Sequence, residues 1–139
     1  MKTIFNISVL AVLLVVAPSP CFALWGVEHV SKERAKKLGM EVRSKAAGPN
    51  HVAVELEFKP EGELKNFSQV DLRISEGENL LVTAPLREDR SKPGHVVVSF
   101  TADRTRLDKT TLRVMVPGGA GGTIYELRVK DFVELEKGR

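Results

Sequence analysis

Seven strand-like stretches restrict the fold of this chain more strongly than any other feature. Six alternate apolar and polar residues with a period of two, and one, residues 79–86, is more apolar throughout. The clearest is residues 52–58, where Val52, Val54, Leu56 and Phe58 are separated by Ala53, Glu55 and Glu57. The other six are residues 40–45, 70–74, 79–86, 96–101, 112–116 and 125–129, the last of which we extend through Phe132 and Val133. A period of two is typical of strands with one buried face, so we predict seven strands.

Turn-forming sequences separate these stretches. They are residues 48–50, 59–62, 76–77, 92–94 and 117–122. No helical spacer lies between the predicted strands, so we expect antiparallel neighbours. Pro85 indicates an edge strand or a bulge, because proline cannot donate to a sheet ladder.

Strands with one apolar face need a second sheet to cover that face. We therefore predict an all-β, immunoglobulin-like or fibronectin-like antiparallel β-sandwich of about seven strands, with a closed barrel as the alternative. Residues 106–114 resemble the crossing turn that feeds the penultimate strand of such sandwiches. The resemblance is to an architecture and to no specific family, and an architecture does not define a function.

One short helix precedes the predicted strands, from Ser31 to Leu38. Ser31 is a favourable N-cap, and Gly39 follows the last turn, where a left-handed residue is common. We divide the chain into a signal peptide (1–23), an N-terminal segment with this helix (24–39), a β-sandwich domain (40–134) and a C-terminal tail (135–139).

The first residues are typical of a secretory signal peptide. Lys2 precedes a mostly apolar stretch, residues 4–17, and small residues at Cys21 and Ala23 mark a cleavage site after Ala23. The apolar stretch is shorter than the roughly 20 residues of a membrane span. We predict a protein that is secreted or periplasmic and spans no membrane after cleavage, the alternative being that the segment is retained as an anchor.

Cys21 is the only cysteine of the chain. Lipidation of this residue is an alternative to simple cleavage, but it favours a small residue at the preceding position, where this chain has Pro20. Cleavage after Ala23 leaves residues 24–139 without a thiol, so we predict no disulfide and a fold that depends on an ordinary hydrophobic core.

The charges argue against a nucleic-acid surface. The formal net charge is +3, and acidic and basic residues are interleaved along the chain. Nucleic-acid binding needs a basic patch on one side of the molecule. We predict no binding of nucleic acid.

Two histidines, His51 and His95, each come directly before a predicted strand. If both strand starts lie at one end of the sandwich, the imidazoles could approach each other and bind Zn or Cu together with Glu55 or Asp71. No His-x-His or His-x3-His spacing accompanies them. Histidines in solvent-facing turns are the simpler interpretation, and we predict no cofactor.

We find no catalytic signature. Glu55 with Glu57, and Glu126 with Asp131, supply pairs of carboxylates, but outward acidic residues opposite basic ones on a neighbouring strand explain them more simply. No serine lies in a Gly-x-Ser-x-Gly sequence. The glycine-rich residues 118–122 lack the Lys-Ser/Thr and the helix of a phosphate-binding loop, so we interpret them as a hairpin connection.

These observations favour an exported, non-enzymatic β-sandwich that binds an unknown envelope or extracellular protein through an edge strand or its loops. The alternatives are a carrier of a metal or glycan ligand, using His51 and His95 or residues 118–122, and a small hydrolase. Charged residues on the first and last predicted strands favour a monomer. Whether Asn66, in the sequon Asn66-Phe67-Ser68, is glycosylated depends on the host.

Overall fold

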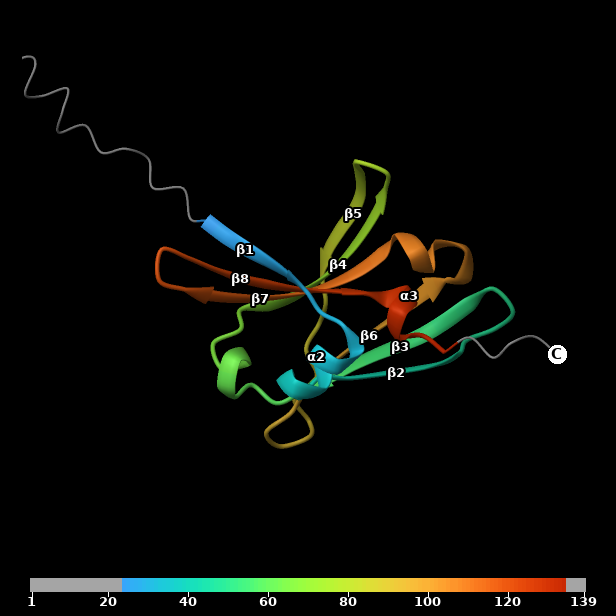
Figure 1. Ribbon diagram of the computed structural model, residues 1–139. Coiled ribbons are helices and arrows are strands. Elements are labelled where there is room, and N and C mark those ends of the chain that lie inside the picture. The colour runs from blue at the N-terminus through green and yellow to red at the C-terminus, as the bar shows by residue number, and fades with distance from the viewer. Residues whose placement is uncertain (1–23, 135–139) are drawn as a thin grey trace, which may run out of the picture.

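The computed structural model describes residues 24–134 (Figure 1). The signal peptide and cleavage site predicted within residues 1–23, the lipidation alternative at Cys21 and the tail at 135–139 lie outside this range. The strands are β1 (Leu24–His29), β2 (Glu41–Ala46), β3 (His51–Phe58), β4 (Gln69–Glu76), β5 (Asn79–Pro85), β6 (Val96–Asp103), β7 (Thr110–Gly118) and β8 (Gly121–Arg128).

The strands form two separate sheets, so the protein is an all-β sandwich and not a closed barrel. The large sheet has the order β1-β8-β7-β4-β5, and the small sheet has the order β2-β3-β6. Each of the seven predicted stretches is a strand. Cross-strand pairs such as Val54 with Phe100 and Leu72 with Leu112 place the alternating apolar residues on the facing sides.

The expectation of a purely antiparallel sandwich of about seven strands is wrong in one respect. Leu24–His29 forms an eighth strand, β1, which pairs in parallel with β8 at the edge of the large sheet. The two strands are the first and last within residues 24–134, and helix α2 follows β1 and carries the chain across to the small sheet. Two parallel strands cannot be joined by a short hairpin, and here nearly the whole domain lies between β1 and β8. The spacing of neighbouring strands in the sequence therefore does not reveal this pair.

Two glycines of β8 make room for β1. A Cβ on Gly121 would overlap the carbonyl oxygen of Leu24, and a Cβ on Gly122 would lie 2.6 Å from the ring of Trp25. Residues 118–122 therefore do more than connect two strands. Their hairpin turns at Gly119, where φ is +59°, and the next two glycines are part of the β1–β8 contact.

The helical elements are short: α2 (Lys32–Leu38), α3 (Val129–Phe132), and the 3₁₀ turns η1 (Gly62–Leu64) and η2 (Arg104–Lys109). Ser31 caps α2 by accepting a hydrogen bond from the Arg34 amide at 3.1 Å, and Gly39 ends it in the left-handed region. The predicted extension of the last strand through Phe132 is wrong, because the chain turns into α3 there. In the described range no helix is both long and apolar enough to cross a membrane.

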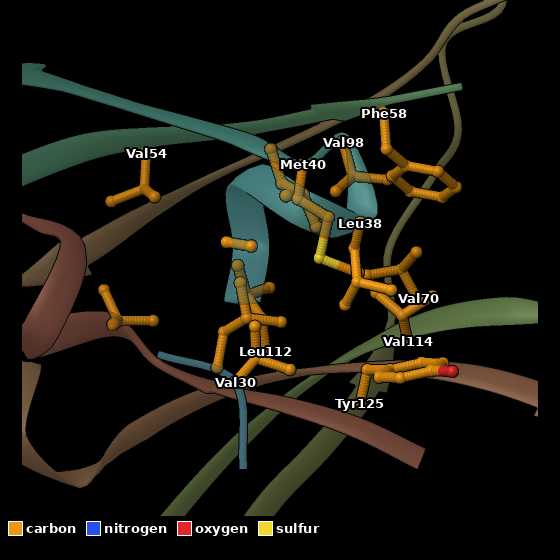
Figure 2. Packing of buried hydrophobic residues seen from close by; sticks show 14 of the residues in the cluster. Val30, Leu38, Met40, Val54, Phe58, Val70, Val98, Leu112, Val114 and Tyr125 are labelled. Carbon is orange, nitrogen blue, oxygen red and sulfur yellow. The ribbon is translucent and has the colours of Figure 1, made fainter. Parts of the chain in front are cut away.

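The core lies between the two sheets (Figure 2). Its fully buried side chains include Phe58, Leu56, Leu64, Leu112, Leu127, Val54, Val70, Val96, Val98, Val114 and Val129. Leu38 at the end of α2 and Met40 just after it pack between residues of the two sheets. Helix α2 therefore closes one end of the core.

The two sheets differ in width, and this difference positions the candidate site. The large sheet ends at β5 and the small sheet ends at β6. Side chains of β6 and of β4 line a common cavity, so β6 lies opposite β4 and β5 has no strand opposite it. In Figure 1 the β4–β5 hairpin projects away from the rest of the molecule. We call the side of the sandwich between β5 and β6 the open side.

Candidate functional site: the open side of the sandwich

Strand β5 presents apolar side chains to solvent. Leu80, Leu81 and Val82 are 50%, 48% and 43% exposed, and they follow one another on the edge of the large sheet. The register shifts between Ile74 and Ser75 of β4, which leaves Leu81 as a bulge. Three consecutive exposed apolar residues on a free edge mark a surface for binding or for self-association.

The hydrogen-bonding groups of β5 alternate between β4 and solvent. The amide of Leu86 donates to the carbonyl of Val70, so by alternation Thr83 and Pro85 direct their backbone groups outward. Pro85 has no N–H to offer there. The edge position that Pro85 indicated in the sequence is confirmed, and the proline and the bulge together interrupt the free edge of β5.

Strand β6 has a free edge of a different kind. Val97 is paired outward with Asp89, through backbone hydrogen bonds of 2.7 and 3.0 Å. By alternation Ser99 and Thr101 also direct their N–H and C=O groups away from β3, and both residues are exposed. The second half of the β6 edge therefore carries an uninterrupted row of backbone donors and acceptors.

A cavity of about 240 Å³ opens between these two edges. Its walls are the apolar side chains of Leu72 and Ile74 from β4 and Phe100 and Ala102 from β6. We call this cavity the mouth. Thr110, at its inner end, is 2% exposed and donates its hydroxyl hydrogen to the carbonyl of Arg106 at 2.7 Å, so its polar group is already satisfied.

Polar residues form the rim of the mouth: His51, Asp103 and Arg106. The carboxylate of Asp103 accepts hydrogen bonds from the amide and the hydroxyl of Thr105, at 2.9 and 2.8 Å. The backbone hydrogen bond from Thr105 is the main cause that lowers the pKa of Asp103 below its ordinary value. Arg106 is exposed and makes no salt bridge within residues 24–134, although it lies close enough to Asp103 to help lower the pKa of that carboxylate. The rim therefore offers a guanidinium whose hydrogen-bond donors are free for a partner.

A charge cluster ties down the chain between β5 and β6. Glu57 is 9% exposed, and its carboxylate binds Arg43 at 2.9 Å and Lys92 at 3.0 Å. His95 Nδ1 lies 3.0 Å from Glu57 Oε2 without being aligned for a hydrogen bond. Hydrogen bonds from Lys92 and then Arg43 lower the pKa of Glu57 to about 2. Glu57 therefore stays ionised and holds the part of this segment around Lys92 and His95 against the small sheet.

The same segment also packs through aromatic contacts. The guanidinium of Arg90 lies 5.4 Å from the ring centroid of Phe67, and Phe67 meets Phe58 edge to face with centroids 5.0 Å apart. These contacts position Asp89 against β6. They explain why only the second half of the β6 edge is free.

The structure does not bring His51 and His95 together. His51 begins β3 and pairs with Asp103, whereas His95 precedes Val96, which pairs with Phe58 at the other end of β3. Seven strand residues separate the two positions, which corresponds to about 26 Å along the sheet. Within residues 24–134 no group of three or more His, Cys, Asp or Glu side chains is arranged to hold a metal ion.

The paired carboxylates singled out in the sequence are engaged in ion pairs. Glu55, like Glu57, contacts Arg43 across the small sheet. Glu126 lies 3.3 Å from His29 and 3.8 Å from Arg113, and Asp131 lies 3.1 Å from Arg128. Cross-strand pairing therefore accounts for Glu55, Glu57 and Glu126, and an ion pair with Arg128 at the end of β8 accounts for Asp131.

Sequence reasoning named an edge strand in general terms but missed the residues of the open side. Leu72, Ile74, Phe100 and Ala102 have the alternation of ordinary core positions, and nothing local shows that no strand covers them. Pro85 was the one usable signal. The chain matches no protein-family model, and no curated protein or solved structure is significantly similar to it.

Proposed function

We propose that this protein is an exported, non-enzymatic β-sandwich module that binds an extended segment of a protein partner on its open side. The observation that carries the proposal is the combination of exposed Leu80, Leu81 and Val82 with the free edge of β6 beside an apolar mouth. Free edges and exposed apolar patches are the features that peptide-binding sheets use.

We further propose that the sandwich is immunoglobulin-like. In variable-type immunoglobulin domains, strands A, B and E lie in one sheet and strands G, F, C and C′ in the other. The orders β2-β3-β6 and β8-β7-β4-β5 correspond to these strands, and η2 takes the place of the corner between strands E and F. Sandwiches of this kind commonly act by binding, which supports a non-catalytic role, although the architecture alone does not assign one.

Export is supported by the N-terminal sequence, with its positive start, its apolar stretch and the small residues at Cys21 and Ala23. The partner is then a protein of the periplasm or the cell exterior. The ion pairing of Glu57 and Glu126 supports a non-enzymatic module, because their carboxylates have structural partners.

Site-specific photo-cross-linking tests this proposal. A photoreactive amino acid replaces Val82 on the open side in one variant and Lys36, exposed on α2, in a matched control. Cells that express the full chain are irradiated, and adducts are mapped by mass spectrometry. We expect one dominant protein adduct from position 82, joined through an extended segment, and none from position 36. Equal adducts from both positions, or none from position 82, would contradict the proposal.

A further inference from the structure

Resting on this proposed function, we infer that the partner segment adds to the edge of β6 as a fourth strand of the small sheet, with an apolar side chain in the mouth and an acidic side chain at Arg106. The segment would lie opposite β5. It would therefore cover the apolar inner surface that the three-stranded sheet leaves open.

The two free edges are not equivalent, and this difference selects β6. Along β5, Pro85 supplies no outward N–H, and the bulge at Leu81 breaks the register. A proline and a bulge both protect the edge of a sheet from pairing with another strand. Along β6, Ser99 and Thr101 each supply an outward N–H and an outward C=O. Of the two edges of the open side, β6 is the one that offers the regular row of donors and acceptors that an added strand needs.

The chain itself limits the length of the added strand. Leu86 is bonded to β4 in the large sheet, whereas Asp89 is bonded to Val97 in the small sheet, so the chain crosses between the sheets at residues 87–88. This crossing closes one end of the β6 edge. From Ser99 to Asp103 five residues remain, which gives room for a strand of about 17 Å.

The mouth accounts for an apolar side chain in the segment. Alternate side chains of an added strand point between the sheets, in the same direction as Phe100 and Ala102 of β6. There they would meet Leu72, Ile74 and the inner face of Val82, which is 43% exposed. The 240 Å³ of the mouth is enough for one large aliphatic or aromatic side chain.

The rim accounts for an acidic side chain. Asp103 keeps its negative charge near Arg106, but its hydrogen bonds are with Thr105 and it makes no salt bridge with Arg106. Glu76, also close to Arg106, is paired with Lys109 at 3.0 Å. His51 adds no negative charge. Arg106 is therefore the group at the open end of the mouth whose charge a partner would complement, and a carboxylate complements it best.

Binding of designed peptides tests this inference. The probe is a fluorescent peptide of about seven residues, with Asp at both ends and with alternating Leu and Thr over the five residues between them, which match the free edge of β6. A second peptide has Lys in place of Asp. Binding of each to residues 24–139 is measured by fluorescence anisotropy, and we expect the acidic peptide to bind about tenfold more tightly than the basic one at low salt.

Two pairs of variants then locate the contact. Thr101→Pro removes one outward N–H from β6, and Thr83→Pro removes the equivalent group from β5. We expect Thr101→Pro to weaken binding about tenfold, and Thr83→Pro to leave it unchanged within about twofold. Arg106→Glu should reverse the preference between the two peptides, whereas Lys36→Glu, the same charge change on α2, should preserve it.

Hydrogen exchange serves as a measurement that needs no variant. We expect the amides of Ser99 and Thr101 to exchange more slowly when the acidic peptide is bound, and the amide of Thr83 to be unaffected. Protection of Thr83 instead would overturn the choice of β6 but leave the proposed function standing. The inference would be overturned if neither peptide bound, or if Arg106→Glu left the preference between the peptides unchanged. It would also be overturned if the open side proved to be a dimer interface, or if a fatty acid such as decanoate bound there in place of the acidic peptide.

Discussion

Replacement of Gly121 by Ala tests whether β1 depends on the glycines of β8. A Cβ at position 121 would overlap the carbonyl oxygen of Leu24 and lie 2.6 Å from its carbonyl carbon, and these are backbone atoms that cannot rotate away. The pairing of Leu24 with Gly121 and of Trp25 with Gly122 should therefore be lost. Gly118→Ala is the matched control, because a Cβ there meets nothing within 4 Å and φ is not positive.

The size of the effect follows from the hydrogen bonds at risk. A net contribution of roughly 0.5–1.5 kcal/mol for each backbone hydrogen bond makes the loss of two about 1–3 kcal/mol. Alanine also reduces the conformational entropy of the unfolded chain, which stabilises the folded state by about 0.4–1 kcal/mol. We expect Gly121→Ala to lower the free energy of unfolding by about 1.3 kcal/mol, the middle of a range that reaches about 2.6 kcal/mol. Gly118→Ala keeps only the entropic gain, so it should raise that free energy by up to about 1 kcal/mol.

The assay is urea denaturation combined with tryptophan emission of the native state. Trp25 is the only tryptophan of the chain, and its ring lies over Gly122, so its emission reports on β1 directly. Loss of the pairing should expose Trp25 and shift its emission to longer wavelength in the Gly121→Ala variant alone. Identical stability and identical emission in the two variants would refute the argument.

Two further predictions concern the charge cluster and the core. Glu57 has a pKa of about 2 against an ordinary value of 4.5, so the stability it contributes is complete above pH 4.5 and is lost as the pH falls towards 2. Thermal unfolding across this range should show a steeper loss for the natural chain than for Glu57→Gln, and parallel curves would contradict the role of Glu57. Phe58→Ala removes a ring that is 1% exposed and should cost about 3–5 kcal/mol in urea denaturation, whereas Leu80→Ala, on the exposed edge, should stay within about 0.5 kcal/mol. Similar losses in these two variants would show that the exposed edge is packed in solution.

The sequence was sufficient for elements whose signal is local. The alternation of Val52, Val54, Leu56 and Phe58 needs only a half-buried strand to explain it, and the structure places all four in the core. Pro85 similarly restricts its own strand to an edge wherever that strand lies. These features follow from the chemistry of the residues themselves.

Features that depend on which distant strands meet could not be predicted in the same way. Residues 24–29 lack a regular alternation, and their close approach to β8 depends on Gly121 and Gly122, which have no Cβ to block it. Glycine inside a strand does indicate a close backbone approach, and this was the available signal for β1. The separation of His51 from His95 likewise follows from the antiparallel pairing of β3 with β6, which neither histidine reveals.

The parallel pairing of β1 with β8 restricts the stage at which the large sheet can fold. The first strand of the domain has no partner until residues 121–126, near the end of the chain, are available. A chain threaded through a membrane with its N-terminus first would carry residues 24–29 unpaired through almost the whole of its passage. Contacts between such distant residues also slow folding. In such a chain the pairing of β1 with β8 could form only after residues 121–126 had also crossed the membrane.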